Sequence, residues 1–309
     1  MTIVRGVVSL IGLLVVTSIA SWLGVSDRHA ESRVLAAAAP LPFFYDLYTF
    51  RSEEHTTSVV AAVAVPVGGL QRERVDGRVR YRFDVRFVLA DTVERIVSRS
   101  LDSVFVSMPA SLPSQHLLHT YVEIQAPPSA ATVQQIVVTD ATRPGVGQLQ
   151  QSPFRIPDYS GTELMLSDIA FGLPGATSGW TRRGFTVALL PTSQFPESDF
   201  DVYYEVYNLP SGNPYETEIA IASLDEDAEG AVVRARFQGR SSAGPDGSMG
   251  DLLRVESPLA TGHYAVTLTV RDQATGRVAS SSRPIEVRGW GRGMTLMPAM
   301  SRVNDPGSR

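Results

Sequence analysis

Cysteine and lysine are both absent from this sequence of 309 residues. Without cysteine there can be no thiol catalysis, iron–sulfur cluster, cysteine zinc site, disulfide framework or lipoprotein anchor. Without lysine there can be no Schiff-base lysine and no P-loop lysine. All 27 basic residues are therefore arginine, and codon bias in a GC-rich genome explains that excess more simply than an arginine-specific function.

Basic charge is not concentrated anywhere in the chain. The formal net charge is -5 and the sequence pI is about 5.6, with 43% hydrophobic and 19% charged residues. A phosphate backbone calls for a basic block or stripe, so we expect no nucleic-acid partner. The hydrophobic content suits one large or two ordinary globular domains with real cores.

The N-terminus has the pattern of an export signal. Arg5 precedes an apolar run over residues 6–25, and small residues near Ala20 and Ala38 offer cleavage sites. The same run is long enough to cross a hydrocarbon core of roughly 30 Å, so residues 1–25 are either a signal peptide or a membrane anchor. Residues 26–41 read as an Ala-rich spacer. Both alternatives predict an exported chain that is periplasmic, secreted or anchored to the inner membrane by its N-terminus.

Alternating apolar residues predict strands through the rest of the chain. Between Val79 and Leu89, five apolar side chains alternate with mostly charged ones, which is typical of a sheet with one face in water. Gly262 to Asp272 alternates in the same way, and Val278 to Val287 follows at hairpin distance. Tyr264, at the start of the former strand, can bond back to the backbone as a sandwich corner. Short strands separated by proline and glycine turns predict an all-β fold.

The second half of the chain repeats the first. Residues 122–127 are echoed by residues 253–258, and Asp140 and Asp272 each close a strand at a similar distance beyond. We also match Phe83-Asp84-Val85 with Phe200-Asp201-Val202, and residues 153–156 with residues 284–287. The repeat predicts two tandem immunoglobulin-like β-sandwich domains after the N-terminal segment, at residues 42–157 and 158–289. Residues 290–309 are expected to be a flexible tail.

Several segments resemble the β-sandwich portion of the bacterial exported GWxTD-domain proteins. The segments that carry the resemblance are residues 154–158, 164–169, 202–209 and 264–272. The motif that names that family is absent, because Gly179-Trp180-Thr181 is followed by Arg182 and Arg183. The resemblance implies an exported β-sandwich protein and brings no biochemical activity with it.

Motifs of catalysis and metal binding are missing. There is no GxSxG elbow and no HExxH, and His116 and His119 would point to opposite faces of a strand. We therefore expect no catalytic residues, no cofactor and no metal, and hence no enzyme. One loop, Asp225 to Glu229, is dense in carboxylates and could bind calcium weakly, but it lacks the spacing of an EF-hand.

The best candidate for a contact surface is the strand around Glu205. Alternation predicts that Val202, Tyr204 and Val206 are buried. Tyr203, Glu205 and Tyr207 would then face outward, and Trp180 is a further exposed candidate. The alternative is that a second sheet or the neighbouring domain covers this face.

These observations favour a non-catalytic exported protein that acts as an envelope scaffold, assembly or protein-interaction component. A protein partner in the cell envelope is expected, and the membrane is a partner if the N-terminal segment is retained. The alternative is an accessory binding module for carbohydrate or peptide, recognised by an exposed aromatic strip. The sequence does not identify the ligand.

Overall fold

The computed structural model describes residues 40–53, 55–195, 199–225, 231–256 and 259–288. The signal or anchor segment, nearly all of the spacer and the tail lie outside these residues. Within them the fold is all-β, as the alternation predicted, with one short 3-10 turn at Val67–Gly69. No helix in the described ranges has the length and apolarity needed to span a bilayer.

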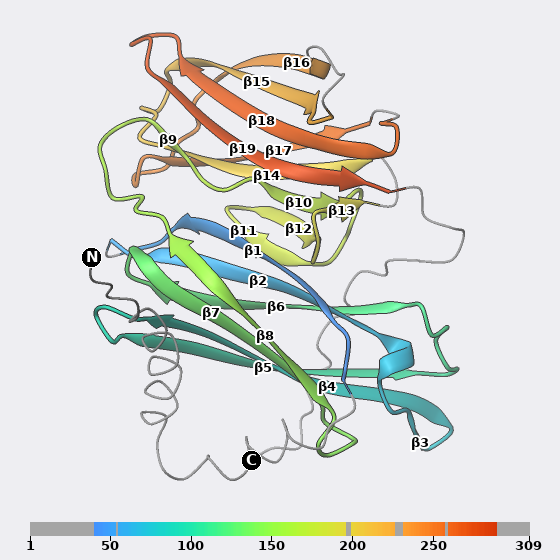
Figure 1. Cartoon of the computed structure of the whole chain (residues 1–309). Helices are drawn as coiled ribbons and strands as arrows, with labels where there is room; N and C mark the ends of the chain where they lie inside the picture. Colours follow the sequence, from blue (N-terminus) through green and yellow to red (C-terminus); the bar gives the residue numbers. More distant parts are fainter. Residues whose placement is uncertain (1–39, 54, 196–198, 226–230, 257–258, 289–309) are drawn as a thin grey trace, which may run out of the picture.

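The described strands form four sheets that lie on one another as four layers (Figure 1). The first layer contains β3 (Glu73–Val75), β4 (Arg78–Asp91), β5 (Val97–Met108), β7 (Ser129–Asp140) and β8 (Gly147–Ile156). The second contains β1 (Phe44–Arg51), β2 (Thr57–Pro66) and β6 (Leu117–Ala126). The third contains β9 (Met165–Leu166), β10 (Ala170–Leu173), β11 (Trp180–Arg182), β12 (Phe185–Leu189), β14 (Phe200–Tyr207) and β17 (Ser248–Val255). The fourth contains β13 (Gln194–Phe195), β15 (Pro214–Ser223), β16 (Ala231–Arg240), β18 (Gly262–Asp272) and β19 (Val278–Val287).

The first two layers make one β-sandwich with its own core. The alternation in β4 assigns the faces correctly, because all five of its predicted core residues are buried. These are Tyr81, Phe83, Val85, Phe87 and Leu89. They pack against inward residues of β2 such as Val59 and Val63. Burial of these apolar side chains is what stabilises the sandwich.

The third and fourth layers make a second β-sandwich. In β18 the predicted face is buried, with Val266, Leu268 and Val270 fully inaccessible, and β18 pairs with β19 as the expected hairpin. The hydroxyl of Tyr264 donates to the carbonyl of Ala260 at 2.9 Å. The predicted tyrosine corner is therefore confirmed.

Seven strands of each sandwich have the same topology. In the first, β1-β2-β6 faces β5-β4-β7-β8, and in the second β10-β14-β17 faces β16-β15-β18-β19. The strand pairs β6 and β17, β7 and β18, and β8 and β19 are thus equivalent, in agreement with the sequence repeat. The match of Phe83 with Phe200 is wrong, because β4 is equivalent to β15, while β14 is equivalent to β2. Short strands have similar alternating sequences, so only the pairing of strands within the sheets shows which of them are equivalent.

Asp140 and Asp272 perform the same task in the two units. Both are almost fully buried at the ends of equivalent strands. Asp140 accepts from the backbone N–H of Thr142 at 2.9 Å, and Asp272 accepts from that of Ala274 at 3.0 Å. Each carboxylate therefore fixes the turn after its strand.

A third core lies between the two sandwiches. It joins Tyr48, Phe50 and Val60 of the first unit to residues of the second that include Trp180 and Tyr203. As a result β2 and β14, the central strands of the two inner layers, are buried on both faces. The inner sheets are packed face to face, so the two units form one continuous stack (Figure 1).

Candidate functional site

Strand β14 carries the predicted contact residues, but they are not exposed. Val202, Tyr204 and Val206 face the core of the second sandwich as predicted. Tyr203, Glu205 and Tyr207 point the other way and are 0% exposed. The prediction of an exposed face is wrong, and the alternative is confirmed: the inner sheet of the first sandwich covers this face.

Trp180 is also buried, at 8% exposure. Its ring stacks on Phe50 of the first unit with centroids 4.9 Å apart, and its Nε1 donates to Glu123 at 3.3 Å. Trp180 begins strand β11, which pairs with β12. Trp180 is thus part of the contact between the sandwiches.

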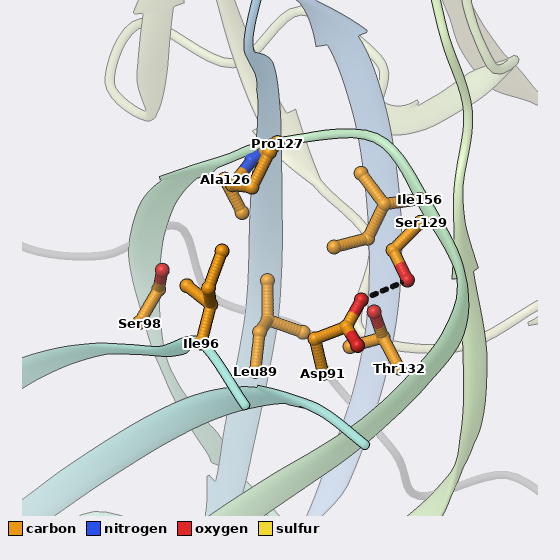
Figure 2. A pocket seen from close by; sticks show the side chains of 9 residues that line it. All are labelled: Leu89, Asp91, Ile96, Ser98, Ala126, Pro127, Ser129, Thr132 and Ile156. Atoms are coloured by element: carbon orange, nitrogen blue, oxygen red, sulfur yellow. Dashed lines mark hydrogen bonds between the residues drawn. The ribbon is translucent and has the colours of Figure 1, made fainter. Parts of the chain in front are cut away.

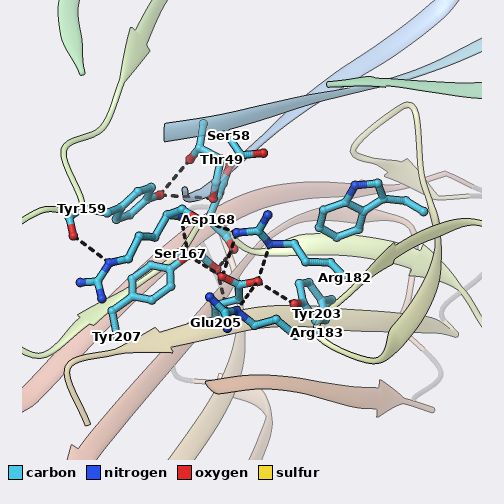
Figure 3. A network of polar contacts seen from close by, with 12 residues as sticks. Thr49, Ser58, Tyr159, Ser167, Asp168, Arg182, Arg183, Tyr203, Glu205 and Tyr207 are labelled. Carbon is cyan, nitrogen blue, oxygen red and sulfur yellow. Dashed lines mark hydrogen bonds and ion pairs between the residues drawn. The ribbon is translucent and has the colours of Figure 1, made fainter. Parts of the chain in front are cut away.

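Glu205 is the centre of a buried polar network (Figure 3). Its Oε1 accepts from Arg182 Nε at 2.6 Å and from the Tyr203 hydroxyl at 2.8 Å, and it lies 3.2 Å from Arg183 Nε. Its Oε2 accepts from the Tyr207 hydroxyl at 2.9 Å. The carboxylate is paired and hydrogen-bonded on both oxygens, which is the condition under which a buried charge is tolerated.

A tight hairpin brings the two arginines to Glu205. Arg182 pairs with Phe185, so Arg183 and Gly184 form a two-residue turn, and their φ angles are 47° and 83°. Two positive φ values are typical of a type I′ turn. The turn places consecutive guanidinium groups beside the same carboxylate.

The arginines of the network keep their charge, and its tyrosines keep their phenol protons. Burial lowers the pKa of the Arg182 guanidinium, but the hydrogen bonds and charge of Glu205 outweigh this effect and hold that pKa above its usual value. Burial raises the pKa of the Tyr203 and Tyr207 hydroxyls, and the nearby Glu205 charge raises both further. Both tyrosines therefore act as neutral hydrogen-bond donors.

Arg51, at the end of β1, connects this network to the first sandwich. Its carbonyl accepts a hydrogen bond from Arg182, and its backbone N–H donates to the Tyr207 hydroxyl at 2.7 Å. Its guanidinium lies over the Tyr207 ring at 4.4 Å and donates to the carbonyl of Tyr159 at 2.9 Å. Polar contacts from both sandwiches therefore meet at Tyr207.

A second ion cluster joins the units around Arg283 of β19. Its guanidinium pairs with Asp46 of the first unit and with Asp168 of the second, the latter at 2.7 Å. It also lies 4.5 Å from the centroid of the Tyr48 ring. Burial raises the pKa of both carboxyls, although the charge of Arg283 opposes that shift. The cluster ties an outer strand of the second sandwich to β1.

The arrangement is suited to holding the sandwiches together. A carboxylate that is fully buried and accepts from two arginines and two tyrosines cannot reach the proton of a substrate. Among the described residues, no group of three or more His, Asp or Glu side chains is placed to hold a metal ion. Of the acidic loop Asp225 to Glu229, only Asp225 is described, so calcium binding there stays a prediction.

A small hollow lies at one end of the first sandwich (Figure 2). Its lining includes Leu89, Ile96 and Ile156, and its space is about that of a single water molecule. Asp91 lies at the rim and accepts from the Ser129 hydroxyl. The hollow is too small for a substrate.

Sequence reasoning missed the arginines of both clusters. Arg182 and Arg183 were noticed only as a departure from a family motif, and Arg51 and Arg283 were not singled out. One signal was present: residues 58–65 have no polar face, and a strand without one is usually buried on both sides. That run shows that something covers β2, but not what.

No protein-family model and no curated protein matches this chain. Among solved structures it is similar to a transglutaminase from red sea bream, with 13% identity, 79% of this chain and 31% of that chain covered, and a TM-score of 0.22. It is also similar to a calcium-binding mutant of β-glucuronidase 2 from Bacteroides uniformis, with 9% identity, coverage of 79% and 28%, and a TM-score of 0.28. The chain spans about a third or less of these proteins' lengths. Likenesses at this level carry no argument about activity.

Proposed function

We propose that this chain is an exported, non-catalytic β-sandwich protein that serves as a scaffold or protein-interaction component of the cell envelope. The observation that carries the proposal is the joint between the sandwiches. Domains in one chain move relative to each other unless their interface is large and apolar. Here an aromatic core and two buried ion clusters oppose such motion. A rigid joint suits a protein that holds partners at a fixed spacing.

Export is supported by the sequence of residues 1–25, which lie outside the described part of the chain. An apolar run behind Arg5 is typical of a signal peptide or an N-terminal anchor. Both would deliver the sandwiches to the outside of the cytoplasmic membrane. The resemblance to the β-sandwich portion of GWxTD-domain proteins agrees with this location.

The contacts of the Glu205 carboxylate support a non-catalytic function. Its oxygens are occupied by arginine and tyrosine donors from the protein itself. The alternative of a carbohydrate-binding module depended on an exposed strip of Tyr203 and Tyr207. Since both are buried, that alternative has lost its surface.

The test is a pull-down of the full-length protein from detergent-solubilised envelope, with mass spectrometry of its N-terminus and of its partners. Stoichiometric envelope proteins on the bait would support the scaffold. A bait that retains Met1 or Thr2 would be anchored, and one cleaved near Ala20 or Ala38 would be free. Recovery of the bait alone would contradict the proposed function.

A further inference from the structure

One face of the first sandwich exposes large apolar side chains. On β5, Val97, Leu101 and Phe105 are 53%, 69% and 50% exposed. They alternate with inward positions, so they lie on the outer side of the first layer. That layer is at one end of the stack (Figure 1). We call the outward side chains of β5, β4, β7 and β8 the β5 face. On this face Arg99 and Ser103 stand between the three apolar residues. Exposed apolar side chains that gather on one face mark an interaction site more often than isolated ones do.

The apolar row continues across the sheet. Leu101 pairs with Arg86 on β4, Arg86 with Val137 on β7, and Val137 with Leu149 on β8. Three of these four side chains are apolar, and Val137 and Leu149 are partly exposed. Side chains at paired positions lie close together on one face.

The second sandwich offers an internal comparison, because its strands are equivalent. The corresponding row reads Arg236, Glu218, Thr269 and Ser280. Its charges are paired, as Arg236 donates to Glu218, and the hydroxyls of Thr269 and Ser280 lie 3.2 Å apart. The same position in the fold is therefore polar and internally satisfied in one unit and mostly apolar, with one arginine, in the other. The fold itself does not require apolar residues there.

The β5 face is also positively charged. Arg82 pairs with Phe105 across the strands, and Arg99 lies between Val97 and Leu101 on β5. Both arginines are exposed, and neither forms an ion pair with another described residue. Asp84 is the single carboxylate among the outward residues of β4 from 78 to 90. A complementary surface would carry apolar side chains flanked by carboxylates.

We propose that the β5 face is the docking site for a protein segment in which apolar residues alternate with acidic ones. The proposal rests on the scaffold function above and names the surface and the chemistry of the partner. A protein is favoured over an anionic membrane because Gln135 and Gln151 lie on the same face. Gln135 Nε2 donates to Gln151 Oε1 at 3.2 Å, and the remaining amide donors and acceptors of the pair suit a polypeptide. Phe105 is the one large aromatic among the exposed apolar residues of β5, which is too few for stacked bases.

The test uses the full-length chain in a non-ionic detergent and a fluorescent synthetic peptide that alternates glutamate with leucine. A peptide that alternates arginine with leucine is the charge control. We expect the acidic peptide to bind, and the binding to weaken about tenfold when Leu101→Ser and Phe105→Ser are combined. Val232→Ser, at an equally exposed position of the second sandwich, is the matched control and should leave the affinity unchanged.

A second pair of substitutions tests the charge. Combining Arg82→Gln with Arg99→Gln should remove most of the dependence of binding on salt, because screened ion pairs are lost. Arg271→Gln, on the outer face of the second sandwich, is the control and should leave the salt dependence of binding unchanged. Unchanged circular dichroism would show that all variants are folded. Equal binding by the face variants and the controls, or a preference for the basic peptide, would overturn the proposal.

Three other outcomes would also overturn it. Phosphatidylglycerol vesicles that displace the peptide from the original β5 face, but do not bind the face variants, would assign the face to an anionic lipid. Self-association that Leu101→Ser abolishes would assign it to a second copy of the chain. An envelope partner retained by both face variants would leave the scaffold function intact and refute this surface. By contrast, an original chain without any envelope partner would refute the scaffold function itself.

Discussion

Arg182 donates from its Nε to the carboxylate of Glu205 at 2.6 Å, while another of its nitrogens donates to the carbonyl of Arg51. The first contact lies within the second sandwich, and the other reaches the first sandwich. One guanidinium thus satisfies a buried charge and bridges the two units. Because both contacts are buried, the energy of this ion pair depends on whether the sandwiches are docked.

Glu205→Gln should destabilise the protein by about 3 kcal/mol, because it removes the nearest carboxylate from the largely buried Arg182, whose other acidic partner, Glu123, lies 3.9 Å away. Arg183 keeps its ion pair with Asp246. The amide keeps the size of the side chain, so packing changes little. The measurement is the free energy of unfolding in urea, followed by circular dichroism.

The matched control for this substitution is Glu218→Gln. Glu218 also pairs with two arginines, but Arg234 and Arg236 are more than half exposed. An exposed pair is worth roughly 0 to 1 kcal/mol, so this variant should stay close to the original protein. If the two substitutions cost the same, burial does not determine the strength of the Glu205 network.

Phe50→Ala should cost about 3 kcal/mol, because it leaves a cavity beside Trp180 in the third core. It should also uncouple the two sandwiches. We expect one cooperative unfolding transition for the original protein and two for the variant, seen by calorimetry. Phe237→Ala is the control, since Phe237 is 46% exposed and lies away from the joint. A single transition for Phe50→Ala would mean that the ion clusters suffice to couple the units.

His119 of β6 makes stability depend on pH. Burial lowers the pKa of its imidazole from 6.5 to about 4, and its Nε2 has no partner among the described residues. Between these two pKa values the unfolded chain binds a proton that the folded chain does not. Stability is therefore complete above pH 6.5 and is lost as the pH falls towards 4, by about 3 kcal/mol.

The measurement is the free energy of unfolding in urea at several pH values between 4 and 7. His119→Leu should remove this part of the pH dependence. His263→Gln is the control, because the His263 side chain is 63% exposed. A pH profile that His119→Leu leaves unchanged would contradict the assignment.

The fold was predictable from the sequence where a strand has one buried face and one solvent-exposed face. The alternation in β4 and β18 identified which side chains are buried, because each strand lies in an outer layer of the stack. The repeat also identified three equivalent strand pairs, two in the outer layers and one, β6 and β17, in the inner layers. The match of Phe83 with Phe200 failed, because a strand of an outer layer and a strand of an inner layer can have the same short sequence pattern.

The site was not predictable, because its partners are distant in sequence. Tyr203, Glu205 and Tyr207 form a polar stripe that would suit water equally well. The sheet of β1, β2 and β6 covers this stripe and makes it an interior surface. The alternation within one strand gives no information about how two sandwiches dock. The apolar character of residues 58–65 was the available hint that the inner sheet is covered.

Tyr264→Phe should destabilise the second sandwich by about 1 kcal/mol, because it removes one hydrogen bond and leaves the carbonyl of Ala260 without its donor. Tyr264 is buried, at 6% exposure. Phenylalanine keeps its ring, so the loss of one oxygen atom hardly alters the packing. Tyr215→Phe is the matched control: it lies in the same sandwich, and its hydroxyl makes no hydrogen bond to the described residues. Urea unfolding of both variants gives the comparison. Equal stability of the two would show that the tyrosine corner contributes packing alone, and a selective loss in Tyr264→Phe would show that the corner fixes the loop that leads into β18.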